Sequence, residues 1–69
     1  MGNKELSNTQ GEAVAKLYLG KVQRGRIDID QGLEEIEKKL NREGYSRGSI
    51  IGVQNEFLHL VEQYGDYRW

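Results

Sequence analysis

The chain has no cysteine, no proline and a single histidine among its 69 residues. Without cysteine it can form neither a disulfide nor a thiolate zinc site, and one histidine among scattered carboxylates is a poor basis for a structural metal. A domain of this length buries only about 60% of the surface of its unfolded chain, so packing of helices, within one chain or between two, must stabilise it. We expect one small domain over residues 1–69, with no cofactor and no metal.

Long apolar runs are also missing. No stretch approaches the roughly 20 apolar residues of a membrane-spanning helix, and the N-terminus lacks the hydrophobic block of a secretory signal. The start Met1-Gly2 is shared with myristoylated proteins, but Leu6 stands where that motif requires Ser or Thr. With 36% hydrophobic and 30% charged residues, the composition is that of a folded soluble chain. We expect a cytoplasmic protein with no membrane role.

Residues suited to catalysis are scarce. His59 is the only histidine, and the helical period places it away from the predicted core, near enough to Glu62 for an ordinary surface pair. The glycines occur singly, so there is no Gly-rich phosphate loop, and a domain this small has little room for a pocket. The sequence therefore predicts that the protein is not an enzyme.

The formal net charge of −1 conceals a gradient along the chain. Residues 1–26 contain five basic and two acidic side chains, whereas residues 27–40 contain two basic and five acidic ones. Such an asymmetry can steer a charged partner, or the two halves can compensate each other within or between subunits. We favour compensation.

The first predicted helix covers residues 7–22. Ser7 and Gln10 fit a capping box, in which side chain and backbone satisfy each other at the helix start. Leu19 projects away from the apolar stripe that follows, which indicates either a second burial surface, such as a dimer contact, or one exposed leucine. The stripe consists of Ala13, Val14, Leu17, Tyr18 and Val22.

The second predicted helix covers residues 31–43. The alternating segment 26–30 is compatible with a short strand, but we prefer Asp28 or Asp30 as an N-cap because a carboxylate stabilises a helix start. Gly44 suits the left-handed position after the helix. Its narrow apolar seam consists of Ile29, Leu33, Ile36 and Leu40.

The third predicted helix covers residues 48–64 and begins after Ser46 or Ser49. Gln54 falls inside its broad apolar face, where it either fixes a pairing register or reaches the rim. Gly52 lies on the opposite face and weakens the helix, so close approach of another backbone is an open alternative. The apolar face consists of Ile50, Ile51, Val53, Phe57, Leu58, Leu60, Val61 and Tyr64.

The ends of the chain differ in character. Residues 1–6 read as a flexible N-terminus, whereas residues 65–69 form an aromatic tail with Tyr67, Arg68 and Trp69. Tyr and Trp bring large contact area with few rotatable bonds, so the tail suits partner binding. Closure of a thin core by Trp69 is the reading we prefer, with partner binding next.

The stretch from Leu33-Glu34-Glu35-Ile36 through Arg42-Glu43-Gly44-Tyr45-Ser46-Arg47 to Ile50-Ile51 resembles the two-helix portion of ribbon-helix-helix repressors and antitoxins. The resemblance covers about 20 residues and implies a strand before the first helix that pairs between two chains and enters the DNA major groove. It also implies nucleic-acid contacts from Arg24, Arg26, Ser46, Arg47 and Ser49. A plain helix-turn-helix with residues 46–60 as the recognition helix is a related alternative.

We expect an all-α fold, a compact three-helix bundle that also forms a helical homodimer. The predicted function is that of a small non-catalytic regulator, an inhibitor or adaptor of a larger protein of the kind common in bacteria and phages. The alternative is a DNA-binding repressor or antitoxin. The residues expected to bind the protein partner are Tyr18, Leu19, Tyr45, Arg47, Tyr67, Arg68 and Trp69.

Overall fold

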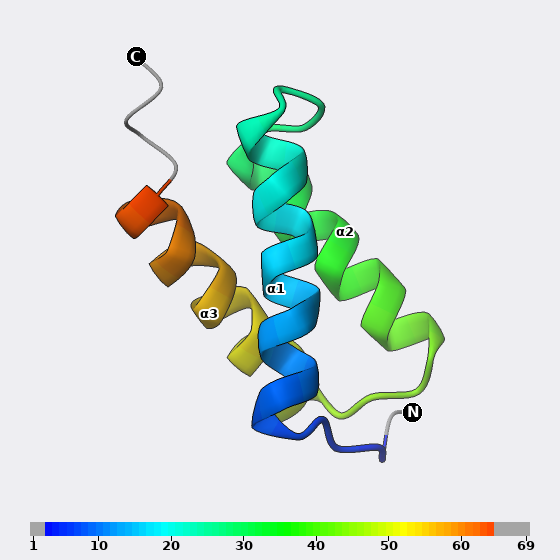
Figure 1. The fold of residues 1–69 in the computed structure, drawn as a ribbon. Helices are drawn as coiled ribbons and strands as arrows, with labels where there is room; N and C mark the ends of the chain where they lie inside the picture. The colour runs from blue at the N-terminus through cyan, green and yellow to red at the C-terminus, as the bar shows by residue number, and fades with distance from the viewer. Residues whose placement is uncertain (1–2, 65–69) are drawn as a thin grey trace.

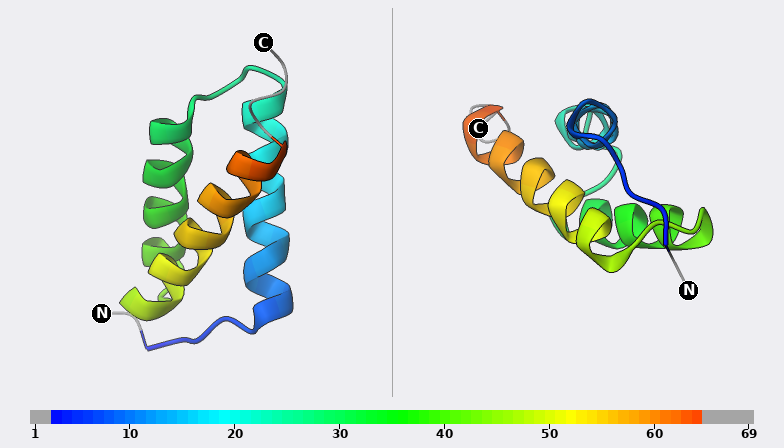
Figure 2. Two further views of the ribbon diagram at one scale, coloured as in Figure 1. Left: turned by 90° about the vertical axis from the view of Figure 1, so that its left-hand side faces the viewer. Right: turned by 90° about the horizontal axis from the view of Figure 1, so that it is seen from below.

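The computed structural model describes residues 3–64, which fold into three helices joined by two turns (Figure 1). Helix α1 spans Asn8–Gln23, α2 spans Ile29–Arg42 and α3 spans Arg47–Tyr64. Helices α1 and α2 lie side by side and antiparallel, and α3 crosses diagonally over both (Figure 2). The predicted compact three-helix bundle is confirmed. Within the part of the chain that is described, no helix is both long and apolar enough to cross a membrane.

Capping boxes start the first two helices. At α1, Ser7 Oγ accepts from Gln10 N at 3.1 Å, and Gln10 Oε1 accepts from Ser7 N at 3.3 Å, as predicted. At α2, Asp28 Oδ1 accepts from Gln31 N at 2.8 Å. Asp28 rather than Asp30 is therefore the cap, so α2 begins two residues earlier than predicted and residues 26–30 form no strand.

Left-handed glycines end α1 and α2. Gly25 has φ +76° and Gly44 has φ +88°, a region that L side chains rarely adopt. In each case the next amide turns back to the helix: Arg26 N donates to Lys21 O and Tyr45 N donates to Leu40 O, both at 3.0 Å. The prediction for Gly44 is confirmed. Of the two predicted starts of α3, the one after Ser46 is correct, and Ser46 Oγ accepts from Ser49 N at 3.2 Å.

The core lies where α3 crosses the other two helices. Phe57 and Ile36 are completely buried, and a Cβ added at Gly32 would stand 2.5 Å from Phe57 Cζ. Gly32 thus lets the Phe57 ring lie directly on the α2 backbone. The buried apolar residues are Ala15, Tyr18, Leu19, Val22, Ile36, Leu40, Ile50, Val53, Phe57, Leu60 and Val61.

Two of the expected partner-binding residues are part of this core. Tyr18 and Leu19 are 5% and 8% exposed, whereas Leu17, predicted to be in the core, is 52% exposed. The prediction that Leu19 points away from the core is wrong because α1 is packed by both α2 and α3, which buries a wider arc than a single contact does. Helix α1 therefore has no spare face at Leu19 for a dimer or a partner.

The predicted apolar arc of α3 is too wide. Ile51 is 47% and Leu58 38% exposed, because both lie beyond the side of α3 that meets α2. Gln54 marks that side: its Nε2 donates to the carbonyl oxygen of Leu33 at 2.9 Å. The polar residue inside the apolar face is thus satisfied within the chain.

The N-terminal segment also differs from expectation. Lys4 forms a parallel bridge with Tyr45, in which Lys4 N donates to Gly44 O at 3.0 Å and Ser46 N donates to Lys4 O at 2.7 Å. The Lys4 ammonium lies 4.6 Å from the centre of the Tyr45 ring. The backbone from Lys4 onward is therefore held against the α2–α3 turn, although the sequence suggested a flexible end.

Candidate functional site

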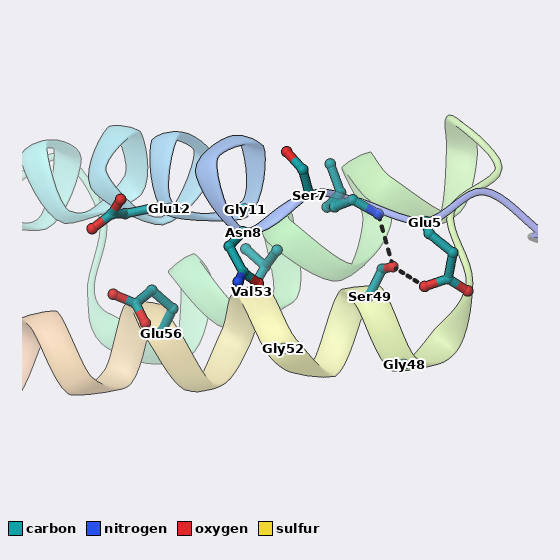
Figure 3. A pocket seen from close by; sticks show the side chains of 11 residues that line it. Glu5, Ser7, Asn8, Gly11, Glu12, Gly48, Ser49, Gly52, Val53 and Glu56 are labelled. Atoms are coloured by element: carbon teal, nitrogen blue, oxygen red, sulfur yellow. Dashed lines mark hydrogen bonds between the residues drawn. The ribbon is translucent and has the colours of Figure 1, made fainter.

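A groove of about 420 Å³ lies between the beginning of α1 and the first half of α3 (Figure 3). Its sides come from the segment that leads into α1 and from the first turns of α3. Three glycines line it, namely Gly11, Gly48 and Gly52, and so do three glutamates, namely Glu5, Glu12 and Glu56. The groove therefore has three lining positions without a side chain, and its lining is acidic.

At two of the glycines, a side chain would touch no other residue of the described part of the chain. A Cβ added at Gly48 or Gly52 would meet nothing within 4 Å, whereas one at Gly11 would lie 3.4 Å from Val53 Cγ2. A glycine inside a helix costs about 1 kcal/mol relative to alanine. Gly52, in the interior of α3, thus weakens the helix, and both Gly48 and Gly52 leave bare backbone open along the groove.

The glutamates of the groove are only partly neutralised. Glu12 Oε2 lies 3.9 Å from Lys16 Nζ, and both side chains are more than half exposed, so this pair is weak. Within residues 3–64, no basic side chain forms an ion pair with Glu5 or Glu56. Figure 3 shows Glu12 and Glu56 on facing helices at one end of the groove and Glu5 at the other. The groove therefore favours a cationic group.

Ser49 holds the Glu5 end of the groove together. Its hydroxyl accepts from Leu6 N at 3.1 Å and donates to Glu5 Oε1 at 3.1 Å (Figure 3). It also accepts from Ser46 Oγ at 3.2 Å. Ser49 is only 9% exposed. One buried hydroxyl thus fixes the N-terminal segment to the start of α3 and orients one acidic side chain.

The residues expected to contact nucleic acid do not form one surface. Arg24 and Arg26 follow α1, whereas Ser46, Arg47 and Ser49 stand at the start of α3, at the opposite end of α2 (Figure 1). Both serine hydroxyls are used inside the chain, which leaves them poorly placed to hold a phosphate. The strand that the ribbon-helix-helix resemblance implies is not formed at residues 26–30.

The residues expected to bind a protein partner are likewise dispersed. Tyr45 is partly buried beneath Lys4, and Arg47 is exposed with its Nη1 atom 3.4 Å from Glu37 Oε2. Tyr67, Arg68 and Trp69 lie outside the described residues. The groove itself was missed, although one signal for it was present: Gly48 and Gly52, spaced four apart in a helix whose apolar residues lie on another face.

One buried ionisable side chain stands apart from the groove. Burial raises the pKa of the Tyr18 phenol, and the Glu35 carboxylate raises it further. The Lys21 ammonium lies 4.7 Å from the centre of the Tyr18 ring and its Nζ is 4.0 Å from Glu35 Oε1. This ion pair joins the basic first part of the chain to the acidic second part, as the charge gradient suggested.

Within residues 3–64, no group of histidine, aspartate and glutamate side chains is arranged to hold a metal ion. Comparison of the chain with protein-family models, with curated proteins and with solved structures finds no match.

Proposed function

We propose that this chain is a small non-catalytic regulator that binds another protein through the groove between α1 and α3. The observation that supports this proposal is the bare backbone of α3 along the groove: within residues 3–64, a Cβ added at Gly48 or Gly52 would meet nothing within 4 Å. Gly52, in the helix interior, also weakens α3. A glycine in a helix allows another backbone to approach closely. A partner segment lying along the groove gives both glycines a role.

The charge of the groove indicates the chemistry of that segment. Glu5, Glu12 and Glu56 line this space, and no cation of the described residues pairs with Glu5 or Glu56, so a segment with Lys or Arg side chains is the favoured occupant. When this chain covers such a segment of the partner, the segment can no longer bind its other ligands. This is how an inhibitor or adaptor acts. A cytoplasmic location and a homodimer stay predictions.

A pair of charge reversals tests the proposal. Glu56→Lys places a cation in the groove. Glu34→Lys makes the same charge change on α2, where Glu34 is 64% exposed and, among the described residues, forms an ion pair only with Lys38. Tagged wild-type protein and both variants are used to capture partners from native lysate, with and without nuclease. We expect one or more proteins to be retained by the wild type and by Glu34→Lys, and to be lost with Glu56→Lys.

The controls separate the possible failures. Thermal unfolding of each variant checks that loss of binding does not reflect loss of fold. A partner that Glu56→Lys retains would contradict the groove as the binding site. Capture that depends on nucleic acid, so that nuclease abolishes it, would contradict protein binding and favour the repressor or antitoxin alternative.

A further inference from the structure

A different face of α3 carries a short exposed strip made of Arg47, Ile51, Leu58 and Glu62. The Arg47 side chain is 73% exposed, Ile51 is 47% and Leu58 38% exposed, and Glu62 is exposed as well. Their spacings of four, seven and four residues place them on one side of the helix. Two large aliphatic side chains thus lie open to solvent between a cation and an anion.

The strip is symmetric about its own midpoint. Arg47 and Glu62 are equally far from the point between Gln54 and Asn55, and so are Ile51 and Leu58. When a second copy of the strip is turned end for end and laid against the first, each aliphatic side chain faces an aliphatic one. Each charged end then faces an end of opposite charge. A single helix face with this arrangement is complementary to a second copy of itself in the antiparallel orientation.

We propose that two copies of this chain associate through these strips, with their α3 helices antiparallel and a two-fold axis between Gln54 and Asn55. Ile51 of one copy then packs on Leu58 of the other, and Arg47 pairs with Glu62 of the other, each contact occurring twice. This proposal does not rest on the groove, whose residues Gly48, Gly52 and Glu56 lie on another side of α3.

The described part of the fold, residues 3–64, leaves this strip available. Gln54 is already bonded to Leu33 O, so α2 is held beside the strip and does not cover it. Within residues 3–64, Arg47 forms an ion pair only with Glu37, at 3.4 Å between exposed side chains, and such surface pairs contribute little to stability. If Arg47 gives up its contact with Glu37 and pairs with Glu62 of a second copy, the chain therefore loses little stabilising free energy.

The first experiment measures the mass in solution by sedimentation over a concentration series up to about 1 mM. Because the strip is small compared with the roughly 800 Å² per partner of a standard interface, we expect a dimer that dissociates on dilution to the monomer of 7.9 kDa. Leu58→Glu is expected to weaken association at least tenfold. Leu17→Glu is the matched control, since Leu17 is 52% exposed on α1, and it should leave association unchanged.

The second experiment tests the antiparallel geometry through charge. Arg47→Glu has two glutamates at the ends of the strip and Glu62→Arg has two arginines, so each variant alone should repel itself and stay monomeric. Mixed together, each arginine strip meets a glutamate strip, and a heterodimer is expected with affinity close to that of the wild type. Thermal unfolding of the single variants confirms that they remain folded.

Several outcomes would overturn the proposal. A wild-type mass of 7.9 kDa throughout the series means that the strip does not self-associate at all. A dimer that Leu58→Glu leaves intact uses another surface. Failure of the mixed Arg47→Glu and Glu62→Arg variants to associate, although the wild type does, rules out the antiparallel pairing.

Discussion

Replacing Gly52 with alanine should stabilise the protein, although most substitutions in a small domain destabilise it. Gly52 lies in the interior of α3, and a Cβ added there meets nothing within 4 Å, so the methyl group has neither a clash nor a new contact. Only the helix propensity changes. The gain expected from that difference is about 0.8–1.0 kcal/mol in the free energy of unfolding.

The assay is urea unfolding followed by circular dichroism, with a thermal scan as a second measurement. For a domain of this size, 1 kcal/mol corresponds to a rise of about 4–8 °C in the melting temperature. Gly20→Ala is the matched control, because Gly20 lies inside α1 and its added Cβ would be 3.9 Å from the Arg24 guanidinium, an ordinary contact with a mobile group. We expect Gly20→Ala to stabilise by a similar amount.

The result that would refute this reasoning is a Gly52→Ala protein no more stable than the wild type while Gly20→Ala is stabilised. It would mean that the backbone at Gly52 is already covered in the folded protein. The groove would then not be the open surface from which a partner site has been argued.

Three further predictions follow from the core and the site. Gly32→Ala should destabilise by about 1–3 kcal/mol in urea unfolding, because its Cβ would stand 2.5 Å from the Phe57 ring; an unchanged stability would mean that the ring moves freely. Ser49→Ala should lower the free energy of unfolding by about 1–3 kcal/mol, because Leu6 N loses its acceptor, and should speed hydrogen exchange of the Leu6 amide. Unchanged exchange at Leu6 would contradict the hydrogen bond to the Ser49 hydroxyl. The pKa of Tyr18 is raised in the folded state, so as pH rises the phenol of the unfolded chain ionises first. The free energy of unfolding should therefore fall as pH rises above about 10, and it should fall less in Tyr18→Phe. Equal losses between pH 9 and pH 11 in both proteins would show that other groups cause the decline.

Local signals in the sequence determined most of the fold. Ser7 with Gln10, Asp28 and Gly44 each act through atoms a few residues away, so their roles can be read without knowing the tertiary structure. Most of the periodic apolar residues of α2 and α3 likewise lie on the faces that meet, although Ile29, Ile51 and Leu58 are exposed. This is why the three helices and their approximate bounds were predictable.

Contacts between distant segments were not predictable in the same way. Leu19 is buried because α1 is packed on two sides, and the period of one helix does not say how many neighbours it has. The bonds from Leu6 and Glu5 to Ser49 join residues more than 40 positions apart. The groove depends on these long-range contacts, so only its glycines, and not its shape, could be recognised from the sequence.

The most direct test of the groove as a protein-binding site compares the affinity of a captured partner for Gly52→Ala and for Gly20→Ala. Both variants should be more stable than the wild type, so a difference between them in binding does not come from folding. We expect Gly52→Ala to bind the partner at least tenfold more weakly, whereas Gly20→Ala should bind like the wild type. Equal, unchanged affinities would contradict the claim that the partner lies along the bare backbone of α3.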